Sequence, residues 1–144
     1  MASAAAPRAR PETGVGSSVS LTIEELCVAT GVTPRLLAEL EQFGLVDGRA
    51  LGPDTVYDDE AMVVCRLAVT MADAGIEARH LRMFKVSAER EAGLYEQLAL
   101  PRLRSQRPEA RQEAAAQVAA LSGAAAELHA ALLRRALRAS LGPL

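Results

Sequence analysis

Apolar residues between Leu21 and Val46 recur at three- and four-residue steps in two short runs, separated by a break at residues 30–33. That spacing places the apolar side chains of each run on one face of a helix. The inward positions are Ile23, Leu26 and Cys27 in the first run and Leu36, Leu37 and Leu40 in the second. The pattern therefore predicts two short amphipathic helices joined by a tight turn.

The residues at the ends of both runs are those that begin and end helices. Thr22 is placed to cap the first helix, and Glu25 three residues later completes a capping box. Gly31 suits the left-handed conformation that ends a helix. Thr33 is a second N-cap residue, and Pro34 follows at the first helical position, where its missing N–H is no loss. Two capped helices around a short glycine-containing turn predict a helix-turn-helix.

A loop and two further helices are predicted downstream. Residues 47–56 are rich in Gly, Pro and Asp, which predicts a loop or a small β-hairpin. Asp58 is placed to cap a third helix that closes at Gly75, and a fourth helix begins near Glu77. The expected fold is all-α: a winged helix-turn-helix followed by long C-terminal helices, with a small β-hairpin as the wing.

From residue 109 to about residue 140 the chain is alanine-rich and predicts one long helix. Its larger apolar residues alternate three and four apart, which is the spacing of a heptad seam. These residues are Val118, Leu121, Ala125, Leu128 and Leu132. Such a helix either pairs with a second long helix or folds back on the core of its own chain. The spacing leaves both arrangements open, because Ser122 and Gly123 interrupt the run.

The order and spacing of these signals resemble the MerR family of transcription regulators. The matching segments are Leu21–Leu26, Thr30–Leu37, Gly44–Val46, Tyr57–Ala61 and Gly75–Ile76. The segment that follows, residues 75–101, resembles the second half of the FtsR-type cell-division regulators of actinobacteria. With that segment included, the resemblance covers roughly residues 21–141.

The resemblance implies a division of the chain into three parts. Residues 1–20 form a flexible leader or linker, residues 21–75 a degenerate MerR-like winged helix-turn-helix, and residues 76–144 a helical regulatory and dimerisation region. It also implies a homodimer in which the long C-terminal helix pairs with its mate. The interface would then contain Val118, Leu121, Ala125, Leu128 and Leu132.

The second helix departs from the family at the residues that grip DNA. Where the family continues with basic residues and tyrosines, this chain has Ala38, Glu39, Leu40, Glu41 and Gln42. The remaining candidates for DNA contact are Thr33, Arg35 and, in the wing, Arg49. Residues 21–75 hold ten acidic side chains against three arginines, a net charge of −7. Because DNA affinity comes largely from neutralising phosphates, weak direct contact is expected, with the main contact made through a linked or partner DNA-binding domain.

The charge of the chain is divided unevenly. The net charge of −2 combines the acidic segment above with residues 76–144, which hold eleven basic and seven acidic side chains. Such a split favours self-association or internal docking over a protein that binds nucleic acid along its whole length.

One basic cluster begins the fourth predicted helix. It contains Arg79, His80, Arg82 and Lys85, with the two arginines three residues apart on one helical face. The cluster is a candidate contact for an anion, an acidic partner or DNA phosphate. The alternative is a solvated or internally paired surface, and this second interpretation is favoured.

The remaining composition excludes several classes. Cys27 and Cys65 have no second Cys or His at metal-ligand spacing, so buried free thiols are expected and no metal site or disulfide framework is predicted. No motif for a catalytic residue or a cofactor is present, which argues against an enzyme. Whether a small-molecule effector binds does not follow from the sequence. No apolar run was expected to reach membrane-spanning length, so a cytoplasmic protein without membrane contact is predicted.

Two functions follow from these observations. The first is a regulatory and dimerisation domain of a MerR/FtsR-like transcription regulator, with little DNA contact of its own. The alternative is a self-sufficient DNA-binding MerR-type regulator that uses Arg35 and Arg49 with help from the basic cluster. Which promoters are involved, and whether the regulator activates or represses, does not follow from the sequence.

Overall fold

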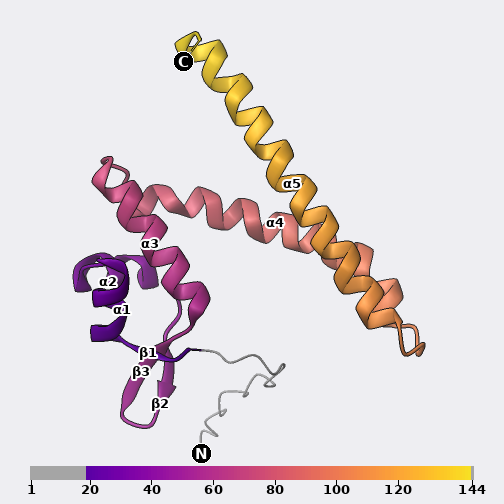
Figure 1. Cartoon of the computed structure of the whole chain (residues 1–144), viewed down its shortest axis with the longest axis horizontal. Coiled ribbons are helices and arrows are strands. Elements are labelled where there is room, and N and C mark those ends of the chain that lie inside the picture. Colours follow the sequence, from indigo (N-terminus) through magenta and orange to yellow (C-terminus); the bar gives the residue numbers. More distant parts are fainter. Residues whose placement is uncertain (1–18, 144) are drawn as a thin grey trace, which may run out of the picture. The chain divides into compact units, whose positions relative to one another are not determined.

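A computed structural model describes residues 19–143 of the chain. The elements, shown in Figure 1, are β1 (Leu21–Thr22), α1 (Ile23–Thr30), α2 (Pro34–Gln42), β2 (Arg49–Leu51), β3 (Asp54–Tyr57), α3 (Asp59–Asp73), α4 (Ala78–Leu103) and α5 (Ala110–Leu141). They form two compact units, one ending at Arg82 and one beginning at Met83, so α4 contributes to both. The predicted leader, residues 1–20, lies almost entirely outside the described residues.

The predicted helix ends are confirmed at the level of hydrogen bonds. The Thr22 hydroxyl accepts from the Glu25 backbone N–H, and the Glu25 carboxylate accepts from the Thr22 N–H at 2.8 Å, a complete capping box. These bonds lower the pKa of Glu25, the bond from the Thr22 backbone contributing most. Gly31 ends α1 with φ +77°, and Asp58 caps α3 through the Ala61 N–H at 2.8 Å. The helix-turn-helix is therefore defined by local chemistry, as the sequence indicated.

The wing is a β-hairpin within a three-stranded antiparallel sheet of order β1-β3-β2. β2 pairs with β3 through Arg49↔Val56 and Ala50↔Thr55, which confirms the predicted hairpin. β1 was not expected; it pairs Leu21 with Tyr57 directly before α1 begins. The sheet thus ties the start of the helix pair to the end of the hairpin.

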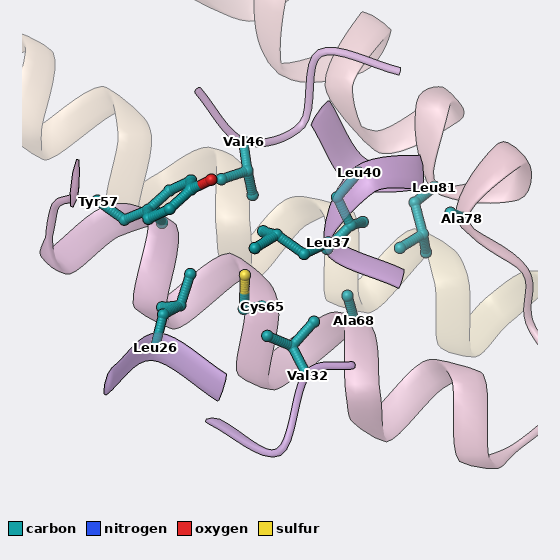
Figure 2. Packing of buried hydrophobic residues seen from close by; sticks show 11 residues of the cluster. Leu26, Val32, Leu37, Leu40, Val46, Tyr57, Cys65, Ala68, Ala78 and Leu81 are labelled. Carbon is teal, nitrogen blue, oxygen red and sulfur yellow. The ribbon is translucent and has the colours of Figure 1, made fainter. Parts of the chain in front are cut away.

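The core of the first unit lies between α1, α2 and α3 (Figure 2). Its buried members are Leu26, Val32, Leu37, Leu40, Val46, Tyr57, Ala61, Cys65, Ala68, Ala78 and Leu81. Thr30 is buried with them. Its hydroxyl is fully hydrogen-bonded to nearby backbone, because it donates to the Leu26 carbonyl and accepts from the Val32 N–H. Ala78 and Leu81 belong to the first turn of α4, so this unit extends slightly beyond the predicted boundary at residue 75.

Both cysteines are free thiols, but the predicted burial holds only for Cys65, which lies in the core (Figure 2). Cys27 is half-buried against the same core. Burial raises the pKa of the Cys65 thiol from 9.0 to about 11, and burial also raises the pKa of Tyr57. A pKa that is higher in the folded state means that folding favours the protonated form. The stability contributed by Cys65 is therefore complete below pH 9 and is lost as the pH rises from about 9 to about 11, and the contribution of Tyr57 is lost only above pH 10.

We expect the free energy of unfolding to fall between pH 9 and pH 11, and to fall less steeply in Cys65→Ala, which lacks the buried thiol. Urea unfolding in reducing buffer at successive pH values measures both slopes. Parallel profiles for the wild type and Cys65→Ala would contradict the role given to the thiol.

The second unit consists of the rest of α4 and α5, which form a helical hairpin. The two helices are joined by bonds from the Tyr95 hydroxyl to the Leu121 carbonyl at 3.3 Å and from Arg102 to Gln117 at 3.0 Å. Figure 1 shows α5 crossing α4 near the turn and continuing beyond it. Pro101 lies within the last turn of α4. The predicted all-α fold with a small hairpin is confirmed.

The expectation that no apolar run reaches membrane-spanning length is wrong for α5. By length and composition, α5 is apolar enough to cross a membrane, and none of its most apolar segment is buried. The long run of alanines raises the mean hydropathy while contributing little apolar bulk. One such helix is weak evidence for a membrane span.

Candidate nucleic-acid interface and helical partner surface

The exposed face of α2 holds the predicted DNA-contact residues Thr33 and Arg35. The Thr33 hydroxyl accepts from the Leu36 N–H at 3.1 Å, so it serves as the helix cap. The Arg35 side chain is 90% exposed, and its Nε lies 3.2 Å from the Glu39 carboxylate. This ion pair partly neutralises the one cation on the helix. The pairing weakens the attraction that Arg35 exerts on a phosphate.

Glu41, the second carboxylate of α2, accepts a hydrogen bond from the Tyr57 hydroxyl at 2.7 Å. Burial, and next this bond, raise the pKa of Tyr57. Glu41 therefore joins α2 to β3. The contact between Glu41 and Tyr57 was not predicted from the sequence, because it depends on where the hairpin places Tyr57.

Arg49 lies on β2 in the wing and is exposed, with its Nη2 3.3 Å from the Ser20 hydroxyl. No carboxylate pairs with Arg49 within the described residues. Residues 19–82 carry eleven acidic side chains against five arginines, a net charge of −6. Arg49 supplies one phosphate contact, whereas specific DNA readers commonly make several.

An open groove of about 480 Å³ lies beside the start of α2. Its walls come from α2 and from the turn between α3 and α4, and they combine apolar side chains such as Leu36 and Val69 with charged ones such as Glu39 and Asp73. No group of three or more metal-ligating side chains gathers here or elsewhere in residues 19–143. The groove is a shallow, mixed surface that identifies no particular effector.

The predicted basic cluster at the start of α4 is used within the chain. Arg79 pairs with Glu77 at 2.7 Å, and Lys85 pairs with Glu89. His80 Nδ1 accepts from the Glu77 N–H at 3.2 Å, and the Arg82 guanidinium lies 6.0 Å from the centre of the Phe43 ring. These contacts agree with the interpretation of an internally paired surface. Both carboxylate partners, Glu77 and Glu89, lie within four residues of the cation with which they pair.

The predicted seam of α5 divides into two parts. Val118, Leu121 and Ala125 are half-buried, and Tyr95 bonds to the Leu121 carbonyl, so this part faces α4 of the same chain. Leu128 and Leu132 continue the seam but are exposed. Three exposed leucines that the heptad spacing missed follow in the last turns: Leu133, Leu137 and Leu141.

In the second unit small apolar residues are buried and large ones are exposed, whereas an independent globular core buries its large apolar residues. Its fully buried apolar residues are three alanines, Ala99, Ala110 and Ala114. The five leucines of α5 from residue 128 onwards are between 37% and 65% exposed. Soluble monomers rarely expose contiguous apolar surface of this kind, which usually marks an interface.

These features define a helix-turn-helix protein with a β-hairpin, joined to a helical hairpin with an exposed apolar surface. The chain belongs to the family described as Rv1828-like, C-terminal domain, whose model matches residues 19–141. It is 37% identical over 136 residues to the uncharacterized HTH-type transcriptional regulator Rv1828 of Mycobacterium tuberculosis, and equally to Mb1859, of the same description, from Mycobacterium bovis. Each match covers 87% of this chain and 53% of the relative, so the chain spans about half the length of these relatives.

Proposed function

We propose that this chain is the regulatory and dimerisation domain of a MerR/FtsR-like transcriptional regulator and makes little DNA contact of its own. The relatives are named HTH-type transcriptional regulators, and the matching family is described as a C-terminal domain. About half of each relative lies outside the match, and we place the main DNA contacts of the regulator in a linked or partner domain. Transcriptional regulators are generally not enzymes and act in the cytoplasm, and both properties are part of the proposal.

The exposed leucines of the second unit carry the dimerisation part of the proposal. Leu128 and Leu132 extend the seam beyond the point where α4 of the same chain covers it. Burying a leucine side chain is worth about 1.5–3 kcal/mol, so a mate that covers this surface is strongly favoured. A second copy presents the same seam and fits the long-helix pairing expected of the family.

The negative charge of the first unit supports the proposal that this chain makes little direct contact with DNA. Arg35 is paired with Glu39, Glu41 keeps a carboxylate on the same helix, and the unit as a whole is anionic. Approach to a phosphate backbone would bring like charges together. The helix-turn-helix therefore serves as a packing scaffold and partner surface in this proposal.

A self-sufficient DNA-binding regulator is the second candidate. It is favoured by the exposure of Arg35 and by Arg49, which has no carboxylate partner in the described part of the chain. The pairing of Arg79 and Lys85 with neighbouring carboxylates leaves less basic surface to assist them.

Sedimentation equilibrium of the whole chain over a range of concentrations tests the dimer. We expect the mass of two copies at micromolar concentration. A mass of one copy at every concentration would overturn the dimerisation role.

A further inference from the structure

The C-terminal half of α5 has two separate apolar faces. Leu128 and Leu132 lie one turn apart on the first face. Leu133, Leu137 and Leu141 follow one another at single-turn intervals on the second, which we call the second stripe. Leu137 is nine residues beyond Leu128, about two and a half turns, so the faces are roughly opposite. A helix that is apolar on opposite sides is typically enclosed by neighbours on both.

Cations border the second stripe. Arg134 and Arg138 are one turn apart and surround a small hollow of about 210 Å³ with Leu137 and Pro143. Neither arginine forms an ion pair within residues 19–143. The stripe therefore favours an apolar partner with a carboxylate at its edge.

α4 exposes a surface of that composition. Leu94 and Leu98 are exposed and one turn apart, and Glu91 lies three residues before Leu94 on the same side of the helix. The Glu91 carboxylate accepts from the Tyr95 hydroxyl at 2.5 Å, and it too has no cation partner in the described chain. The hydrogen bond holds this carboxylate at Tyr95, where Glu91 lines an open groove together with Val118 and Ser122 of α5, and Leu94 follows three residues later on α4.

The second stripe does not reach these leucines within one chain. The Leu121 carbonyl bonds to Tyr95, which is the neighbour of Leu94, so this part of α5 is level with the α4 surface. Leu133 lies twelve residues further on, roughly 18 Å along the helix axis at 1.5 Å per residue. An α4 surface that meets the second stripe must come from another molecule.

We propose that the second stripe of one copy packs on Leu94 and Leu98 of a second copy, with Arg134 and Arg138 facing Glu91 of that copy. The inference rests on the proposed dimer and names the surfaces that complete it. Two opposite faces of α5 require two neighbouring helices, and the hairpin of a mate supplies two. Each copy then contributes both α4 and α5 to a four-helix assembly.

Charge reversal with mixing tests the contact. Glu91→Arg alone places three cations together in the homodimer, and Arg134→Glu with Arg138→Glu places three carboxylates together. We expect each homodimer to be weakened by at least about tenfold in Kd. When the two variants are mixed, both contacts regain opposite charges. Native mass spectrometry should then show mixed dimers well above the half that random assortment gives, with an affinity near that of the wild type.

Matched controls separate charge pairing from damage to the helices. Glu91→Gln keeps an acceptor for Tyr95 without a repulsive charge and should dimerise more tightly than Glu91→Arg. Glu96→Arg, roughly 140° around α4 from Glu91, and Arg111→Glu, in the first turn of α5, should each leave Kd unchanged. Circular dichroism should show wild-type helicity for all variants.

The outcomes distinguish this contact from dimerisation itself. Random assortment of the two reversed variants, with wild-type dimers intact, would overturn the contact between α4 and the second stripe while leaving the dimer. A monomeric wild type would overturn the proposed function instead. Loss of a tetramer with retention of the dimer would assign the stripe to a different assembly and would also overturn this contact.

Discussion

The double substitution Leu128→Glu with Leu132→Glu is expected to convert the dimer to a monomer. Both side chains are exposed in the single chain, so the substitutions remove no contact within it. In the proposed dimer they place two carboxylates in an apolar seam, where a charge without a partner is strongly unfavourable. A loss of about 4 kcal/mol or more in the free energy of dimerisation corresponds to a Kd for the dimer at least about a thousandfold weaker. Sedimentation velocity measures the change directly.

The controls for this substitution use the rest of the chain. Ala116→Glu adds the same charge at an exposed position of α5, roughly 120° around the helix from Leu128, and should leave the dimer intact. The first unit should remain folded, because its core lies at residues 26–81. An unchanged sedimentation coefficient for the double variant would remove Leu128 and Leu132 from the interface.

Leu40→Ala is expected to destabilise the helix-turn-helix strongly. Leu40 is fully buried at the centre of the core between α2 and α3 (Figure 2). Truncating a leucine at such a position costs about 2–5 kcal/mol, because the transfer free energy is lost and a cavity remains. Urea unfolding followed by circular dichroism, at a fixed protein concentration, measures the difference.

The comparison for Leu40→Ala is Val28→Ala, at a position on α1 that is 88% exposed. We expect that change to stay within about 0.5 kcal/mol of the wild type. If the two variants proved equally stable, Leu40 would not hold the position in the core that the structure gives it.

The helix-turn-helix was predictable because its signals are local. Thr22, Gly31, Thr33 and Asp58 act on residues within four positions of themselves, so the sequence alone indicates where the helices begin and end. β1 was missed because its two residues become a strand only by pairing with β3, more than thirty residues later. A strand of this length has no periodicity to detect.

The surfaces were predictable only in part, because a surface depends on long-range packing. The charge deficit of the first unit follows from counting residues, but the Glu41–Tyr57 bond depends on where the hairpin places Tyr57. The heptad spacing found Leu128 and Leu132, yet it could not show that Val118 and Leu121 are half-buried against α4. It also missed Leu133, Leu137 and Leu141, because they lie on a different face of α5 from the seam.

The proposed function depends most on the anionic surface of a helix-turn-helix, the fold of many DNA-binding proteins. Fluorescence anisotropy of a labelled random-sequence duplex pool, titrated with the whole chain at several salt concentrations, tests that claim directly. We predict a Kd weaker than about 10 μM near physiological salt, in the range of non-specific binding or beyond it. Tight binding that weakens by about a thousandfold between roughly 50 and 200 mM salt would contradict the account, since such a slope requires several phosphate contacts.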